Sequence, residues 1–195
     1  MQEHEINSIE NLFIAGYIHD DTTFCDELIN HFKQSKKKST GSTSTRNGNR
    51  VNIKEKDSLD IQLTDVTMSN KYFIQLKQAT DKYIEKFPYC NHYSKWSITE
   101  RPNIQYYKPG AGYHAWHTER HSIAQPVGSR HLVYMTYLND VTDNGETEFF
   151  HQKLKIKPQK GLTLIWPSDW TYTHRGVTSL TQDKYIVTGW FNFTN

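Results

Sequence analysis

The second half of the sequence constrains the fold most strongly, because short runs of β-branched and aromatic residues recur there between turn residues. These runs include "WSITERPNIQYY", "HLVYMTYLND", "GLTLIW" and "YIVTGWFNF". Their composition is typical of strands, and no helical pattern separates them. A parallel sheet built from βαβ units is therefore not favoured. The pattern predicts an antiparallel sandwich or jelly roll over residues 96–195.

The first of two helical patterns lies in "DTTFCDELINHFKQS", residues 21–35. Its apolar residues recur at the spacing of one helix face. They are Phe24, Leu28, Ile29 and Phe32. Asp20 or Asp21 is a candidate N-cap, because a short polar side chain can accept a free backbone N–H.

The second helical pattern runs from Asn70 to Phe87 and ends at Pro88, which cannot continue a helix. Between the two patterns, residues 36–50 are polar and rich in Gly, Ser and Thr, which predicts an exposed loop. A chain of 195 residues is long enough for one domain with its own core. We therefore predict a single, mainly β domain over residues 1–195, with a helical support region at 1–95 and the β core at 96–195.

Charge and cysteine content exclude little by themselves. The formal net charge is +2, and acidic residues are spread between the lysine clusters, so nucleic-acid binding is not favoured. Cys25 and Cys90 form no CxxC motif, so no disulfide framework or zinc ribbon is predicted. No apolar run approaches the roughly 20 residues of a membrane span. We expect a soluble, cytoplasmic protein that does not bind membranes.

The segment "GYHAWHTERH", residues 112–121, gathers three histidines and a glutamate. On a helix, His117 and His121 would share a face and provide an HxxxH zinc pair. On a strand, His117 and Glu119 would point the same way. The preceding "PGAG" discourages a helix start. The strand is therefore favoured, with His117 and Glu119 as a pair of metal ligands.

His174 is the best candidate for a third ligand. It lies in "WPSDWTYTHRGVTSL", directly after the apolar strand "GLTLIW", where a turn of a jelly roll can bring it back across the sheets. Two histidines and one carboxylate on one face of an octahedron suit non-haem Fe(II), although the same donors also suit zinc. Lys184 opens the following strand, where its charge can meet an anion bound near the metal.

Four segments together resemble the prolyl 4-hydroxylase-like 2-oxoglutarate- and Fe(II)-dependent oxygenases, most closely members encoded by tailed phages. They are "QYYKPGAGYHAWHTE", "RHLVYMTYLNDVTDNGETEFF", "LKIKPQKGLTLIWPSDWTYTHRG" and "DKYIVTGWF". The resemblance covers roughly residues 104–193, and residues 13–32 also resemble the N-terminal part of the phage members. It implies a double-stranded β-helix, or jelly roll, as the core. It also implies a host-cytoplasmic location if the protein is encoded by a phage.

The resemblance implies roles for the candidate residues. His117, Glu119 and His174 match the iron ligands of the family, and these three would form the catalytic centre. Lys184 matches the residue that binds the distal carboxylate of 2-oxoglutarate. Tyr107 matches a tyrosine that hydrogen-bonds the same co-substrate.

Two further residues match the lining of the family's cavity. Tyr137 matches a pocket position, with Val133 and Met135 on the same strand face. Trp190 matches an aromatic residue of the same cavity. Glu119 departs from the common pattern, in which the carboxylate ligand is Asp. The extra methylene moves the carboxylate outward, and phage members of the type resembled also have Glu.

The function implied is a dioxygenase that uses Fe(II), 2-oxoglutarate and O2, with ascorbate as a candidate additional cofactor. It would hydroxylate an unactivated C–H bond of a protein, peptide or small molecule, with peptidyl proline as one candidate, and release succinate and CO2. One alternative is a catalytically silent metal-binding jelly roll that acts as a binding module or virion component. Another is a zinc hydrolase that uses His117 and His121.

Overall fold

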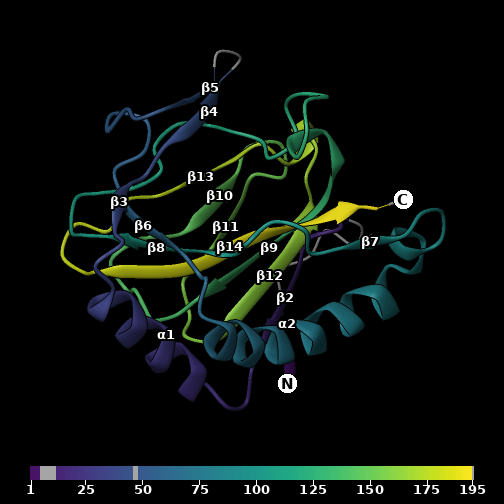
Figure 1. The fold of residues 1–195 in the computed structure, drawn as a ribbon, viewed down its shortest axis with the longest axis horizontal. Helices are drawn as coiled ribbons and strands as arrows, with labels where there is room; N and C mark the ends of the chain where they lie inside the picture. Colours follow the sequence, from purple (N-terminus) through teal and green to yellow (C-terminus); the bar gives the residue numbers. More distant parts are fainter. Residues whose placement is uncertain (5–11, 46–47, 195) are drawn as a thin grey trace.

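The computed structural model describes residues 1–4, 12–45 and 48–194. Within these residues, a large and a small antiparallel sheet face each other, and two helices cover the outer face of the large sheet (Figure 1). This arrangement confirms the prediction of a mainly β jelly roll with N-terminal helices. It also places the inner faces of both sheets around a common interior.

The large sheet contains nine of the described strands, all paired antiparallel. In spatial order they are β1 (Gln2–His4), β2 (Ala15–Ile18), β12 (Leu162–Pro167), β9 (Arg130–Tyr137), β14 (Lys184–Phe193), β8 (Asn103–Tyr107), β6 (Leu59–Gln62) and β3 (Ser39–Thr40), while β7 (Trp96–Ser97) also pairs with β14. The small sheet has the order β11 (Leu154–Ile156), β10 (Thr147–Phe149) and β13 (His174–Gly176).

Helix α1 spans Thr23–Gln34, as its apolar spacing predicts. Its N-cap is Thr22, so the prediction of Asp20 or Asp21 was wrong, although the Asp21 carboxylate accepts the Thr23 N–H at 2.9 Å. An aspartate two residues ahead of a helix can reach the first free N–H without itself being the cap.

Helix α2 spans Val66–Lys86 and begins four residues before the predicted start at Asn70. Its N-cap is Asp65, whose carboxylate accepts the Met68 N–H at 2.8 Å. This cap stabilises a first turn that lies outside the apolar pattern. The helix ends before Pro88, as predicted, and Pro88 begins a short 3-10 helix, Pro88–Asn91. Two further 3-10 helices span Val127–Ser129 and Trp170–Tyr172.

Alternation along the central strands separates two cores. On β9, Leu132 and Tyr134 pack toward the helices, whereas Val133 and Met135 point between the sheets. On β14, the odd-numbered Tyr185, Val187 and Phe191 likewise join the helix side. The even-numbered positions of β14, which include Lys184, therefore face the interior between the sheets.

The predicted loop 36–50 contains short strands, which the sequence prediction missed. Strand β3 pairs with β6, and β4 (Thr43–Thr45) forms a hairpin with β5 (Gly48–Arg50) that projects from the body of the fold (Figure 1). Residues 46–47 of this segment lie outside the described residues. Polar residues pair here because the edge of a sheet leaves one side of each strand in water. The region before residue 95 thus supplies strands of the large sheet as well as helices.

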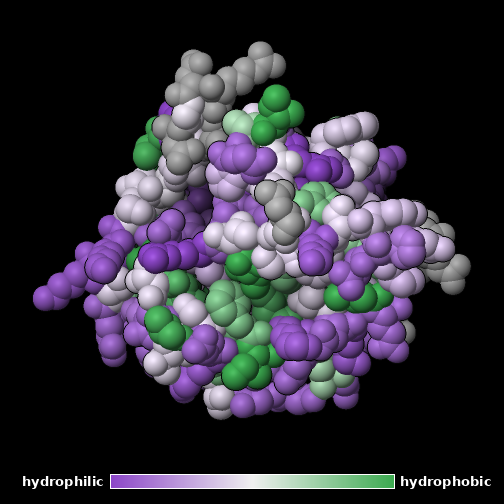
Figure 2. Space-filling view, turned by 45° about the vertical axis from the view of Figure 1, so that its right-hand side comes forward, coloured by the Kyte–Doolittle hydropathy of each residue, from purple (hydrophilic) through white to green (hydrophobic). Residues whose placement is uncertain are grey.

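The face shown in Figure 2 is mostly hydrophilic, with an apolar patch in its lower half. A groove beside α2 is lined in part by apolar side chains, among them Leu63, Val66, Phe73 and Ile98. Leu63 belongs to the core on the helix side of the large sheet. Neither described helix has the length and apolarity needed to cross a membrane.

Candidate metal centre

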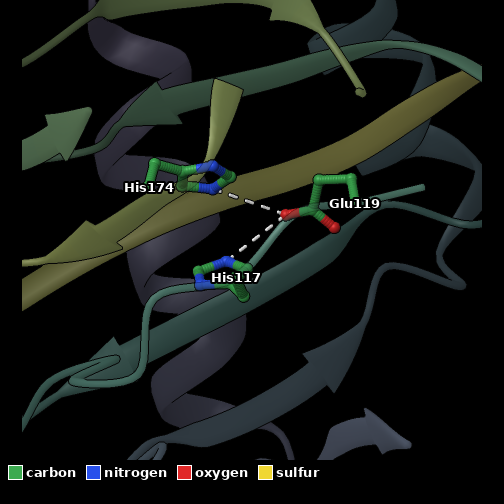
Figure 3. A group of neighbouring side chains, drawn as sticks. All are labelled: His117, Glu119 and His174. Carbon is green, nitrogen blue, oxygen red and sulfur yellow. Dashed lines mark ion pairs between the residues drawn. The ribbon is translucent and has the colours of Figure 1, made fainter. Parts of the chain in front are cut away.

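Three side chains converge at one end of the interior: His117 and Glu119 from one extended segment, and His174 from β13 (Figure 3). Each offers one donor atom, and these atoms lie within 4.8 Å of one another. Nε2 of each histidine is 3.5 Å from Oε1 of Glu119. The structure therefore brings together the three residues that the sequence analysis selected.

The segment that carries His117 and Glu119 is extended, but it forms only an isolated bridge and not a regular strand. The N–H of His117 donates to the carbonyl of His174 at 3.0 Å, and the reverse bond is 2.9 Å. Between the two ligands, the Thr118 hydroxyl turns the other way and donates to the Ser168 carbonyl at 2.9 Å. The two-residue period of an extended chain thus holds here. His121 is exposed and lies outside the cluster.

The hydrogen bonds of both imidazoles leave the correct nitrogen available to a metal. Nδ1 of His117 lies 3.0 Å from the carbonyl of Ala115, and Nδ1 of His174 lies 2.9 Å from the carbonyl of Tyr172. A carbonyl only accepts, so each Nδ1 carries a proton and Nε2 is the nitrogen left to face a metal. Burial lowers the pKa of His117, and the nearby His174 lowers it further. Two imidazoles that present Nε2 beside a carboxylate fit a divalent transition metal.

Glu119 is a partly buried carboxylate, 14% exposed, with several partners. Burial alone would raise its pKa, but its contacts with His117 and His174 outweigh burial and hold the pKa well below the usual range. Oε2 also accepts a hydrogen bond of 2.9 Å from Nε1 of Trp190, and Nη1 of Arg130 lies 3.5 Å from the same oxygen. Glu119 is therefore ionised and can act as a metal ligand at neutral pH.

The three residues line a cavity of about 690 Å³ that opens to the surface. One wall consists of inward-facing side chains of β6, β8 and β14. They include Gln62, Asn103, Gln105, Tyr107, Lys184, Ile186, Thr188 and Trp190. Of the four predicted co-substrate residues, the structure places Tyr107, Lys184 and Trp190 in this wall.

Tyr137 is not among the residues that line the cavity, and its pocket role stays a prediction. Its side chain is fully buried in the core between the sheets. Its hydroxyl lies 2.6 Å from the hydroxyl of Thr147 and 3.2 Å from the carbonyl of Ile156. Met135, on the same face of β9, does line the cavity. The strand leaves the cavity between these two positions and passes beneath β10 and β11.

Lys184 is a buried cation in the cavity wall. Its side chain donates to the carbonyl of Gly145 at 3.0 Å, and burial lowers its pKa to about 8, although the charge of Glu146 acts in the opposite direction. Among the described residues, no carboxylate lies within ion-pair distance of its ammonium group. A buried ammonium with one carbonyl partner is poorly compensated. This position therefore suits the carboxylate of a bound ligand.

Tyr107 lies beside Lys184, because the two residues are directly paired across β8 and β14. The Tyr107 hydroxyl donates to Oε1 of Gln105 at 2.6 Å. Burial raises the pKa of Tyr107 well above its ordinary value. The phenol therefore stays protonated, and it would donate to a ligand beside the Lys184 ammonium by releasing Gln105.

Two neighbours of the triad were not selected as site residues from the sequence. The ring of Tyr113 stacks on the ring of His117, with centroids 3.7 Å apart and an angle of 6° between the planes. Arg130 contacts both Glu119 and Trp190. Tyr113 lies within the histidine-rich segment, so the sequence itself shows an aromatic residue close to His117. Arg130 had no such local signal, because it lies eleven residues beyond Glu119.

Comparison with known proteins finds one matching family model. Residues 102–192 match the model of the 2OG-Fe(II) oxygenase superfamily. This match includes all seven residues that were predicted as ligands or co-substrate contacts. A search of curated proteins finds no match.

Solved structures share the fold across nearly the whole chain. The viral collagen prolyl hydroxylase vCPH from Paramecium Bursaria Chlorella virus-1, in a 2OG complex, has a TM-score of 0.66 and 20% identity, with 95% of this chain and 98% of that chain covered. A Pseudomonas putida prolyl-4-hydroxylase has a TM-score of 0.69 and 15% identity, with 92% of each chain covered. A Trichoplax adhaerens prolyl hydroxylase, in complex with a hypoxia inducible factor peptide fragment, has a TM-score of 0.71 and 18% identity, with 96% and 86% covered.

Proposed function

Because residues 102–192 match the model of the 2OG-Fe(II) oxygenase superfamily, we propose that this 2-oxoglutarate-dependent dioxygenase holds its Fe(II) with His117, Glu119 and His174. The observation that carries the assignment is the convergence of their three donor atoms within 4.8 Å. The two Nε2 atoms that face the cluster and the ionised carboxylate supply the donor set that Fe(II) accepts.

Lys184 and Tyr107 are the proposed anchor for 2-oxoglutarate. The Lys184 ammonium is buried without a carboxylate partner among the described residues, and the Tyr107 phenol beside it is protonated. Together they offer one charged and one neutral donor to a carboxylate. Trp190 belongs to the same wall through its contact with Glu119. Tyr137 is left out of this anchor, because it is not among the residues that line the cavity.

Bound Fe(II) and 2-oxoglutarate supply the oxidising power for hydroxylation of an unactivated C–H bond, with release of succinate and CO2. The chain's own residues orient these groups and shield them. The Tyr113 ring covers one face of the His117 imidazole, and Trp166 contacts His174 edge to face, with ring centroids 5.2 Å apart. These aromatic contacts fix the imidazole planes and keep water from the histidine rings.

Peptidyl proline is the proposed substrate class. The support is the similarity in fold to three proteins named as prolyl hydroxylases, one of them viral and one bound to a peptide fragment. The cavity of about 690 Å³ opens to the surface, so a side chain of a polypeptide can enter from outside. The single-domain organisation and the cytoplasmic location stay predictions from the sequence.

Turnover and metal binding test the assignment in one experiment. Protein supplied with Fe(II), 2-oxoglutarate and O2 is expected to form succinate, with a proline-containing peptide library as the substrate and ascorbate present in parallel samples. His117→Ala and His174→Ala should abolish both Fe(II) binding and succinate formation. His121→Ala is the matched control, because His121 borders the cavity without joining the cluster.

The alternatives make different predictions for the same variants. A zinc hydrolase that uses His117 and His121 would lose its metal in His121→Ala, but the extended backbone separates these residues. A silent metal-binding module would bind Fe(II) through the triad and form no succinate with or without a peptide. That second outcome would contradict the proposed activity while leaving the metal site intact.

A further inference from the structure

The two carboxylate oxygens of Glu119 have different partners. Oε1 lies 3.5 Å from Nε2 of both His117 and His174. Oε2 accepts the hydrogen bond of 2.9 Å from the indole N–H of Trp190, which lies on β14, 71 residues away in sequence. One oxygen therefore faces the imidazoles, and the other is held by a donor on the opposite sheet.

Arg130 in turn holds the indole of Trp190. Its guanidinium carbon lies 3.5 Å from the centroid of the indole ring, which is a close cation–π contact. Nε and Nη2 of Arg130 donate to the two carboxylate oxygens of Glu100 at 2.9 and 2.8 Å. This paired geometry fixes the plane of the guanidinium group. The indole therefore stacks on a guanidinium group whose orientation is fixed by Glu100.

Arg130 also contacts the main chain of Glu119. Nη1 donates to the carbonyl oxygen of Glu119 at 3.1 Å, in addition to its longer contact with Oε2. The Arg130 side chain is only 10% exposed, so water competes weakly for these contacts. Arg130 thus contacts both the carbonyl and the carboxylate of Glu119, and Trp190 contacts the carboxylate.

We propose that Trp190 and Arg130 are positioning residues that adapt the metal site to a glutamate. A glutamate has one more rotatable bond than an aspartate, and holding its carboxylate costs additional side-chain entropy. The indole N–H offsets this cost by binding Oε2 before a metal arrives, so that Oε1 stays directed at the two imidazoles. This inference rests on the proposed function, because it takes Glu119 as a ligand.

Co(II) binding without co-substrate tests the proposal, because it reads the site independently of turnover. Trp190→Phe keeps an aromatic ring against Arg130 and removes the N–H donor. We expect Co(II) affinity to fall roughly tenfold, the scale typical of a lost partner to a metal ligand. The visible absorption spectrum of bound Co(II) should also change. A benzothienyl analogue of tryptophan at position 190 keeps the two-ring shape without the N–H and should behave like Trp190→Phe.

Trp96→Phe is the matched control. The indole N–H of Trp96 donates to the carbonyl of Cys90 at 3.0 Å, so this variant also loses one indole hydrogen bond. Trp96 packs against Phe191 on the helix side of the sheet, with ring centroids 4.9 Å apart. Co(II) affinity and spectrum should match the wild type, even if the free energy of unfolding falls.

A double-mutant cycle with Glu119→Asp separates positioning from general packing. The aspartate carboxylate is one methylene shorter and cannot face both imidazoles while it accepts the Trp190 N–H. Glu119→Asp alone should weaken Co(II) binding, and adding Trp190→Phe should then have little further effect. Equal losses from Trp190→Phe in both backgrounds, or wild-type affinity in Trp190→Phe, would overturn the proposal. Loss of Co(II) binding in His117→Ala without succinate formation by the wild type would instead contradict only the proposed activity.

Discussion

Lys184 and Tyr107 are direct partners across β14 and β8, with the ammonium nitrogen 5.0 Å from the centroid of the phenol ring. The pairing gives a buried cation and a protonated donor on one wall of the cavity. The two residues lie on strands that are far apart in sequence. The charge of this pair and the pKa of Lys184 can be measured separately from the metal.

Lys184→Ala should weaken 2-oxoglutarate binding while leaving metal binding nearly unchanged. Loss of a charge-assisted hydrogen bond to a carboxylate costs about 1.5–3 kcal/mol, or roughly tenfold to a hundredfold in affinity. Calorimetric titration of 2-oxoglutarate into the Mn(II)-loaded protein, without O2, would measure this loss. Lys155→Ala is the control, because Lys155 is an exposed lysine of β11. Unchanged affinity in Lys184→Ala would remove Lys184 from the co-substrate site.

Binding of 2-oxoglutarate should also depend on pH through Lys184. Burial lowers its pKa to about 8 in the free protein, so the ammonium loses its proton as the pH rises through that value. The affinity for a carboxylate should therefore be constant below about pH 7 and fall above about pH 8, by up to about tenfold per pH unit. Lys184→Arg should flatten this decline, since arginine stays charged. The same calorimetric titration, repeated from pH 6.5 to 9.5 for the wild type and Lys184→Arg, would measure this pH dependence.

The two-residue period of an extended chain was sufficient to predict that His117 and Glu119 point the same way. It placed His117 and Glu119 on one side, and the position of His174 after an apolar strand supplied the third donor. That inference did not need a regular strand, because an isolated bridge keeps the same alternation. The family resemblance added the roles of Lys184 and Tyr107, which local patterns alone do not assign.

Other parts of the site depend on contacts that no local pattern records. Arg130 reaches Glu100 thirty residues earlier and contacts Trp190 sixty residues later, and each contact is set by the packing of the sheets. Strand alternation gives the face on which Tyr137 lies, but not how far the cavity extends along the strand. The strands within residues 36–50 were missed because edge strands can be polar on both sides.

The buried His19 should make stability sensitive to mild acid. Its Nε2 lies 2.9 Å from the Thr163 hydroxyl, and burial lowers its pKa to about 4. Below about pH 6.5 the unfolded chain binds a proton at this histidine that the folded protein does not, so stability is lost as the pH falls from 6.5 toward 4. The expected loss between pH 7 and pH 5 is about 2 kcal/mol.

Urea unfolding at pH 7 and pH 5 would measure this loss for the wild type and for His19→Gln. The variant should lose less stability between the two pH values, by about 2 kcal/mol. The difference between the proteins is the informative quantity, because burial also lowers the pKa of His131, and that residue remains in both. Equal pH dependence in the two proteins would contradict a buried, neutral His19.

Gly189 should tolerate no side chain, because it lies directly opposite Tyr134 where β14 pairs with β9. A Cβ at this position would overlap the hydroxyl and ring carbon of Tyr134, a fully buried residue on the helix side of the sheet. Gly189→Ala therefore forces the two central strands apart or moves a packed ring, which costs about 1–3 kcal/mol. Because Trp190 follows directly, the same displacement should weaken Co(II) binding. Ile74→Ala, at an exposed position of α2, is the control for both measurements. Wild-type stability in Gly189→Ala would show that Tyr134 can move without cost.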